Sequence, residues 1–225
     1  MQSISRQAPA YSRSSPSPHY LRLVSEYRRM HTEVEQFAQI PAEQTFKGQS
    51  LPRHGATIKT LVEKYRARTL LDYGSGKGWQ YTAVQVTLPD GTSYASIPAY
   101  WGVESVTCYD PGYEPFSRIP TGTFDGVVST DVLEHCPEDD IDWILGEMFG
   151  YAERFVFANV ACYPAQKRLS SGENAHCTVR PKSWWLAALG RASARRPQVR
   201  YLFLLDSVKQ SPDGANQLET EMLSG

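Results

Sequence analysis

Short apolar runs alternate with longer amphipathic segments along the chain. Each run is bounded by turn-forming residues, which is typical of a buried strand, whereas the amphipathic segments repeat apolar residues at helical spacing. Strands alternating with helices favour a mostly parallel sheet, so we expect an α/β fold with ligands at the carboxyl ends of the strands. The predicted strands are 69–72, 103–109, 124–130, 154–160 and 199–205. The predicted helices are 18–39, 55–65, 79–87, 137–152 and one starting near Pro181. The polar residues that follow the last strand have no predicted structure.

The first 50 residues precede this alternation and form an extension. Residues 1–18 are rich in Ser, Pro and Arg, and alone they would be disordered. The helix that follows places Tyr20 and Tyr27 among charged residues. Two interpretations remain open: a helical lid over an active site, to which both tyrosines would contribute, or a brace on the outside of the sheet. We therefore divide the chain into the extension, 1–50, and a Rossmann-like domain, 51–225.

The composition limits the partners. Lys and Arg number 23 against 24 Asp and Glu, and a net charge of −1 gives no field that would draw the chain onto nucleic acid or an anionic membrane. The four cysteines lack the spacing of a zinc site, so we expect reduced thiols, no metal and a cytoplasmic protein. Apolar runs all fall short of the ~18 residues of a membrane span. The oligomeric state has no signal in the sequence.

A glycine-rich loop follows the first predicted strand. Gly74, Gly76 and Gly78 occupy alternate positions after Asp72, where a backbone without Cβ atoms lets a ligand approach closely and permits positive φ. The spacing differs from the usual dinucleotide fingerprint and from the phosphate-binding P-loop. The loop therefore indicates either a nucleotide site or an ordinary turn from strand to helix.

An acidic residue at the end of the second predicted strand favours the nucleotide. Asp110 follows an apolar run and precedes Pro111. A carboxylate at this position accepts hydrogen bonds from both hydroxyls of a ribose, although an Asp before Pro is also a common turn former. Together with Asp72 and the three glycines, Asp110 favours ribose binding.

At this point the chain resembles the class I S-adenosylmethionine-dependent methyltransferases. The residues that carry the resemblance are 71–78, Asp110, and Phe124-Asp125 followed by 131–135, and it covers about residues 55–205. It implies a Rossmann-like sheet with S-adenosylmethionine over the glycine loop, Gly74 and Gly76 facing the methionine part and Asp110 holding the ribose. The sulfonium would lie above Ser129, Thr130 and Asp131. Segment 111–123 is shorter than the family's usual helix and strand, so Ile119 is the predicted apolar contact to the adenine.

A narrower resemblance concerns the reaction. Segments 76–81, 157–164 and 172–181 are similar to azetidine-2-carboxylate synthases, which have the methyltransferase fold but transfer no methyl group. In that family the α-amine of S-adenosylmethionine attacks its own γ-carbon, which gives azetidine-2-carboxylic acid and methylthioadenosine. The family's functional tyrosine and asparagine match Tyr81 and Asn159.

The chemistry of ring closure is compatible with these residues. The amine must be neutral when it attacks, which favours neutral hydrogen-bond partners such as Tyr81 and Asn159 over carboxylates. Alternatively, Tyr81 only packs beneath the loop, and Asn159 is a strand-end residue without a function. His176 and His135 are candidate proton acceptors. Asp131 either contacts the amino-acid end or caps a helix, and Tyr163 is a candidate pocket residue.

Three functions are compatible with these residues. The leading interpretation is an enzyme that cyclises S-adenosylmethionine as its only substrate. The second is a methyltransferase acting on a small molecule, with a histidine as base. The third is a non-catalytic nucleotide-binding protein, which has less need of polar residues at the strand ends.

Overall fold

The computed structural model describes residues 11–33, 41–46, 50–82, 85–87, 91–210 and 216–225. It contains a six-stranded sheet in the order β4-β1-β5-β6-β7-β8, in which every neighbouring pair is parallel except β7 and β8. The strands are β1 (Thr69–Tyr73), β4 (Ser105–Tyr109), β5 (Phe124–Thr130), β6 (Ala152–Ala161), β7 (Arg200–Gln210) and β8 (Asn216–Ser224). The predicted α/β fold with a mostly parallel sheet is confirmed, and its order is compatible with a Rossmann-like architecture.

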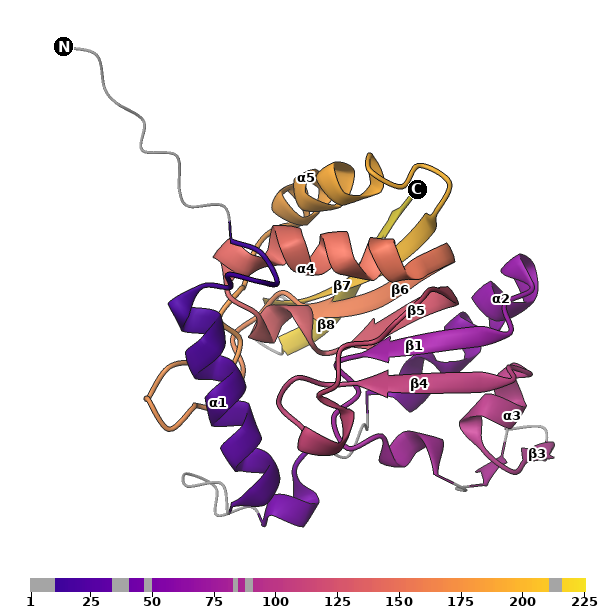
Figure 1. The fold of residues 1–225 in the computed structure, drawn as a ribbon, viewed down its shortest axis with the longest axis horizontal. Helices are drawn as coiled ribbons and strands as arrows, with labels where there is room; N and C mark the ends of the chain where they lie inside the picture. The colour runs from indigo at the N-terminus through magenta and orange to yellow at the C-terminus, as the bar shows by residue number, and fades with distance from the viewer. Residues whose placement is uncertain (1–10, 34–40, 47–49, 83–84, 88–90, 211–215) are drawn as a thin grey trace.

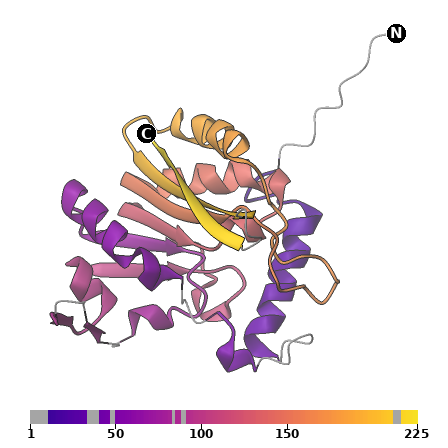
Figure 2. The ribbon, with the colours of Figure 1, turned by 180° about the vertical axis from the view of Figure 1, so that it is seen from behind.

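Helices cover both faces of the sheet (Figure 1). Successive strand residues point to opposite faces, so Leu71 packs with α4 and α5 whereas Leu70 packs with α2 and α3. From behind, α2 lies over the sheet and β8 forms its edge (Figure 2). The helices are α2 (Gly55–Tyr65), α3 (Ile97–Trp101), α4 (Glu138–Tyr151) and α5 (Lys182–Ser193). In the described ranges, none of the helices is both long and apolar enough to cross a membrane.

The strand order places a switch point beside the glycine loop. The chain leaves β1 for β4 on one side and then returns to β5 on the other side of β1. Loops diverge at such a point, and open α/β sheets bind ligands in the crevice that results. Residues 111–123 contain only the 3₁₀ helix η4 (Glu114–Phe116), as expected from the shortness of this segment.

The extension contains α1 (Pro18–Thr32), which lies across the carboxyl ends of β1 and β4 (Figure 1). The predicted helix was longer, but Glu33 is already extended, and the hydroxyl of Thr45 donates to the terminal-turn carbonyl of Met30 at 2.9 Å. The rest of the prediction, 34–39, lies outside the described residues. Two 3₁₀ turns, η1 (Ala42–Gln44) and η2 (Leu51–His54), complete this part of the chain.

Residues 11–17 are fixed against α4, so this part of a segment expected to be disordered alone is ordered within the folded chain. Residues 1–10 lie outside the described ranges. Arg13 donates from Nε to Glu147 at 2.7 Å and from Nη2 to the hydroxyl of Tyr73 at 2.9 Å, and its guanidinium lies 4.7 Å from the centre of the Trp143 ring. The backbone N–H of Ser17 donates to Asp140 at 3.0 Å. These tertiary contacts offset the conformational entropy that is lost when the segment becomes ordered. The few apolar residues of the segment could not offset that loss by themselves.

Two predictions between the strands differ from the structure. The helix predicted at 79–87 is wrong, because the 3₁₀ turn η3 (Trp79–Tyr81) ends at an extended Thr82 and β2 (Val86–Thr87) pairs with β3 (Ser93–Tyr94). The β-branched residues after Tyr81 favour extended structure. The unassigned tail forms β8, whose side chains are mostly exposed apart from Leu223. A solvated edge strand has no apolar run to reveal it.

Candidate functional site

The glycine loop forms a tight turn at the end of β1. Gly74, Gly76 and Gly78 have φ values of 90°, 57° and 65°, in the left-handed region that favours glycine. A Cβ on Gly74 would overlap the methyl groups of Val132, and one on Gly78 would lie 2.8 Å from the ring of Phe116. Glycine is therefore required by conformation and by space. The helix N-terminus expected after the loop is replaced by η3.

Asp110 ties the loop to the end of β4. One carboxylate oxygen accepts from the N–H of Gly76 at 2.9 Å and the other from the N–H of Gly112 at 2.8 Å. Burial raises the pKa of Asp110, and these backbone N–H groups act in the opposite direction. Each oxygen accepts two hydrogen bonds, so the carboxylate keeps capacity for a hydroxyl pair.

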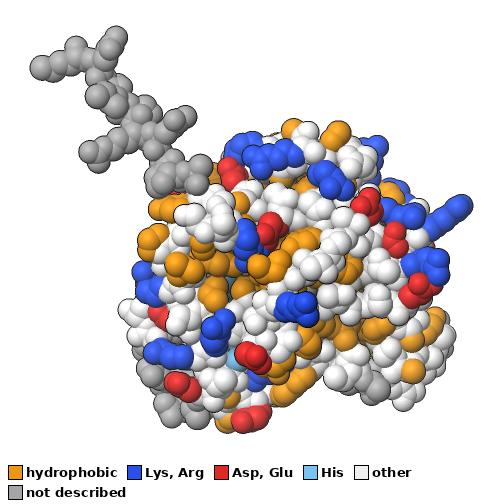
Figure 3. All heavy atoms as spheres, viewed as in Figure 1, with side chains coloured by type: hydrophobic (Ala, Val, Ile, Leu, Met, Phe, Trp, Pro, Cys, Tyr) orange, Lys and Arg blue, Asp and Glu red, His pale blue; other side chains and the backbone are white. Residues whose placement is uncertain are grey.

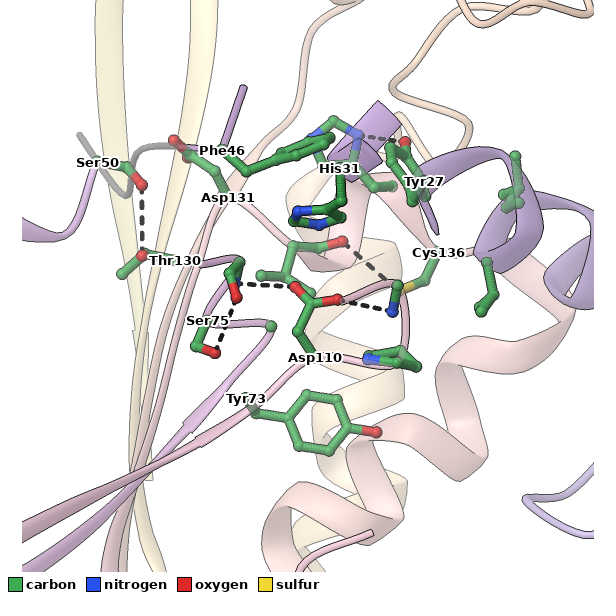
Figure 4. A pocket seen from close by; sticks show the side chains of 18 of the residues that line it. Tyr27, His31, Phe46, Ser50, Tyr73, Ser75, Asp110, Thr130, Asp131 and Cys136 are labelled. Carbon is green, nitrogen blue, oxygen red and sulfur yellow. Dashed lines mark hydrogen bonds between the residues drawn. The ribbon is translucent and has the colours of Figure 1, made fainter. Parts of the chain in front are cut away.

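A cavity of about 440 Å³ lies between the glycine loop, the end of β5 and α1. Figure 4 shows side chains from the loop and from α1 on its walls, and Figure 3 shows apolar side chains gathered on the same face. This volume lies in the range of ~300–1,000 Å³ typical of small-molecule sites. The predicted site residues that line it are Tyr20, Tyr27, Gly74, Gly76, Asp110, Thr130 and Asp131.

The other predicted site residues lie outside this lining. Ser129 is buried and donates to the carbonyl of Tyr73 at 2.7 Å, whereas Ile119 is 51% exposed. Gly78, at the end of the loop, lies against the side chains of Phe116 and Cys108. The full set outside the lining is Asp72, Gly78, Tyr81, Ile119, Ser129, Asn159, Tyr163 and His176.

Tyr81 belongs to a buried cluster below the loop. Its hydroxyl donates to Asp72 at 2.8 Å, and the side-chain amide of Gln80 donates to the same carboxylate oxygen at 3.1 Å. Burial raises the pKa of Asp72 to about 7, against the effect of these two hydrogen bonds. The Tyr81 ring meets Trp101 edge-on at 6.1 Å. The sequence places Tyr81 close to the ligand loop, but its hydroxyl points to Asp72.

Asn159 holds Asp131 from the neighbouring strand. The Asn159 amide donates to the Asp131 carboxylate at 2.6 Å, and the Asn159 oxygen accepts from the backbone N–H of Asp131 at 3.2 Å. Asp131 has a left-handed φ of 53°, an uncommon value for a residue with a side chain. Its other oxygen lies 3.6 Å from Nη2 of Arg53. Asn159 therefore holds Asp131, whose backbone is left-handed, with its carboxylate at the cavity wall.

Two histidines and a glutamate meet beside the cavity. His135 lies in η5 (Leu133–His135) and its Nδ1 is 2.8 Å from the carbonyl of Ala175 and 2.9 Å from the hydroxyl of Tyr27. Nδ1 of His176 is 2.6 Å from the carbonyl of Tyr163. Burial lowers the pKa of His135 to about 4 and raises that of Glu134 to about 8. Of these residues, only Tyr27 and His135 line the cavity.

Several lining residues, among them Phe46 and Arg53, were not identified from the sequence. The rings of Phe46 and His31 lie 4.6 Å apart, and Arg53 faces Asp131. Phe46 and Arg53 belong to short 3₁₀ and loop segments without periodicity, so no local pattern distinguishes them from surface residues. Phe46 reaches the cavity through the path of the extension, and Arg53 lies in η2, directly after the extension ends.

Comparisons with known proteins give no family assignment. A scan against protein-family models found no match, and a search of curated proteins found no significant similarity. The fold and the cavity therefore carry the functional argument, together with the motifs described above.

Proposed function

We propose that the chain binds S-adenosylmethionine in this cavity and closes the ligand's α-amine onto its γ-carbon, giving azetidine-2-carboxylic acid and methylthioadenosine. The observation that carries the proposal is the meeting of the glycine loop, Asp110 and the aromatic side chains of α1 around one cavity at the switch point of the sheet. Each of these features serves a different part of the ligand.

In this proposal Asp110 binds the nucleoside end of the ligand. Its carboxylate would accept the two ribose hydroxyls, and the rings of His31 and Phe46, which line the cavity, would border the adenine. These rings replace the exposed Ile119 in the proposed adenine contact. The methionine chain would then cross the glycine loop toward Thr130 and Asp131, where Arg53 provides a cation for the α-carboxylate.

Cyclisation requires the amine to lie behind the γ-carbon, about 3–3.5 Å away and in line with the departing sulfur. The α-ammonium group first loses one proton to solvent, which leaves a neutral amine. The nitrogen–carbon bond then forms as the carbon–sulfur bond breaks, its electron pair returns to sulfur, and the ring nitrogen carries the positive charge. The Tyr27 hydroxyl is a neutral partner on the cavity wall that can orient the amine. Asp131, held by Asn159 and facing Arg53, would fix the other end of the folded chain.

Tyr81 and Asn159 enter this proposal as positioning residues. Tyr81 would act through Asp72 beneath the glycine loop, and Asn159 through Asp131. Both hydrogen-bond partners lie at the end of a strand, so a small displacement would be transmitted to the ligand. Such misplacement is costly for a reaction that depends on alignment.

The size of the cavity supports a reaction with one substrate. About 440 Å³ is near the lower end of small-molecule sites, and α1 forms one wall. A nucleoside joined to an amino acid would occupy most of this space and leave little for a methyl acceptor. Exclusion of an acceptor by the bound ligand would leave the internal amine as the nearest nucleophile.

The test is incubation of the purified protein with S-adenosylmethionine alone, followed by mass spectrometry. The proposal requires methylthioadenosine and a ring-closed imino acid in equal amounts. Asp110→Ala should abolish product formation, whereas Asp142→Ala, which removes an exposed partner of Arg191, should not. S-adenosylhomocysteine formed only with an added acceptor would favour a methyltransferase. Ligand binding without either product would favour a non-catalytic protein.

A further inference from the structure

Glu134, His135 and His176 form a compact cluster from two distant segments of the chain. Glu134 and His135 belong to η5 after β5, and His176 belongs to the loop before α5. One ligand-type atom from each residue, a ring nitrogen or a carboxylate oxygen, lies within 4.8 Å of the other two. The N–H of Thr178 donates to the backbone carbonyl of Glu134 at 3.0 Å, which holds the two segments together.

Both imidazoles are oriented by backbone carbonyls. Nδ1 of His135 lies 2.8 Å from the oxygen of Ala175, and Nδ1 of His176 lies 2.6 Å from that of Tyr163. A carbonyl only accepts, so we assign the proton of each neutral ring to Nδ1 and its lone pair to Nε2. The Tyr27 hydroxyl, 2.9 Å from Nδ1 of His135, then donates to the carbonyl of Ala175 at 3.4 Å. This arrangement, in which one ring nitrogen donates to a carbonyl and the other is free to coordinate, is the usual second shell of metal-bound histidines.

Glu134 supplies an unpartnered carboxylate oxygen. Its side chain is fully buried, and Oε1 accepts from the N–H of Ala161 at 3.1 Å. Oε2 has no hydrogen-bond partner among the residues that the structure describes. A fully buried carboxyl oxygen without a partner is unfavourable, and such groups are normally hydrogen-bonded, neutralised by a proton or coordinated to a metal.

The surrounding charges favour a cation at this place. Asp131 and Asp206 are close enough to act electrostatically on Glu134, whereas Lys167 acts on His135 in the opposite sense. Asp131 is itself paired with Arg53, which lies 3.6 Å from its carboxylate. The ligands of a tetrahedral ion at ~2.1 Å lie roughly 3.4 Å apart, so modest side-chain rotations would bring the three groups into range.

We propose that Glu134, His135 and His176 bind one divalent transition-metal ion through two imidazole Nε2 atoms and a carboxylate oxygen. Two histidines and one carboxylate suit zinc or ferrous iron rather than magnesium or calcium, which prefer oxygen ligands. Three protein ligands leave coordination positions open, and His135 lines the cavity, so the ion would be accessible from the cavity side. This site goes beyond the proposed cyclisation, which needs no metal.

The test uses chelator-treated, full-length protein without S-adenosylmethionine, titrated with Zn²⁺ in a calorimeter and with Co²⁺ in a spectrophotometer. We expect one ion per chain and an intense visible Co²⁺ band from a four-coordinate site. His176→Ala and Glu134→Gln should each weaken Zn²⁺ binding by at least roughly tenfold, as loss of a ligand should exceed the second-shell effect. His19→Ala is the matched control, because it removes a histidine outside the cluster and should leave affinity unchanged.

The proposal would be overturned if the wild-type protein took up neither ion at about 100 µM. A dissociation constant of that size corresponds to a binding free energy of ~5.5 kcal/mol. Equal Zn²⁺ affinity in wild type and His176→Ala would also overturn it. Circular dichroism of each variant separates loss of the site from loss of the fold. Because the readout is metal binding by the protein alone, its failure is distinguishable from failure of the proposed cyclisation.

Discussion

Replacing Asn159 with alanine should release Asp131 from its left-handed conformation. The substitution removes the amide that donates to the Asp131 carboxylate at 2.6 Å and the oxygen that accepts from the Asp131 N–H at 3.2 Å. Asn159 is 2% exposed, so solvent does not replace these bonds at its own position. Asp131 would then be free to leave a φ of 53°.

The expected cost is about 2 kcal/mol in the free energy of unfolding. A hydrogen bond to a charged group contributes ~1.5–3 kcal/mol and a neutral one ~0.5–1.5 kcal/mol. The first value is reduced because the side chain of Asp131 is 36% exposed and its charge is screened. Relaxation of the left-handed backbone returns up to about 1 kcal/mol.

A double-mutant cycle isolates this contact. Urea unfolding of Asn159→Ala, Asp131→Ala and the double variant should give a coupling energy of about 1–2 kcal/mol. The pair Asn174→Ala and Asp131→Ala is the control, because Asn174 bonds to the backbone of Ala165 instead, and its effects should add. Coupling within the error of the control pair would refute the assigned role of Asn159.

The same variant tests the function. If Asn159 positions Asp131 for ring closure, turnover of S-adenosylmethionine should fall at least roughly tenfold, because alignment dominates such a step. Affinity for the ligand should change much less, since Asp110 and the glycine loop are untouched. Product formation measured by mass spectrometry and ligand binding measured by calorimetry separate the two effects.

Three further predictions concern the loop and the extension. Gly74→Ala should destabilise the protein by about 1–3 kcal/mol more than Gly91→Ala, because both positions have positive φ but only Gly74 would meet Val132; equal losses on urea unfolding would exclude the steric argument. The raised pKa of Asp72, about 7 against 3.8, means that the unfolded state loses its proton first, so wild-type stability falls as pH rises between these values. Asp72→Asn lacks this loss, and its stability relative to wild type should increase by about 3 kcal/mol from pH 5 to pH 8; parallel pH profiles would contradict the shift. Arg13→Ala should lower stability by ~1–2 kcal/mol in thermal unfolding through loss of its bonds to Glu147 and Tyr73, and an unchanged melting temperature would show that this contact contributes nothing.

The parallel strands were predictable because each is a local apolar run. The predicted strand at 124–130 coincides with β5, and the predicted helix at 55–65 coincides with α2. The positive φ of Gly74, Gly76 and Gly78 follows from their spacing after β1. These features depend on neighbouring residues in the chain, which is the information that a pattern contains.

The direction of the polar side chains was not predictable in the same way. Tyr81 and Asn159 were expected at the ligand, but their polar groups bond to Asp72 and Asp131. Pairing of β5 with β6 brings Asn159 next to Asp131, whereas the 3₁₀ turn after the glycine loop folds Tyr81 back onto Asp72. Sequence spacing alone does not determine which way either side chain points. The aromatic contribution of Phe46 was missed for the same reason, since it depends on the path of the extension across the sheet edge.

The contacts of Arg13 connect residues 11–17 to the wall of the cavity. Its guanidinium reaches the hydroxyl of Tyr73, and Tyr73 is itself part of the cavity wall. A change in the packing of the Tyr73 ring would therefore alter the contact that holds residues 11–17, which lie outside the cavity. Trypsin cleaves after Arg13 only when this segment leaves its docked position. The rate of cleavage therefore reports, without a label, on changes in the packing of Tyr73 at the cavity wall.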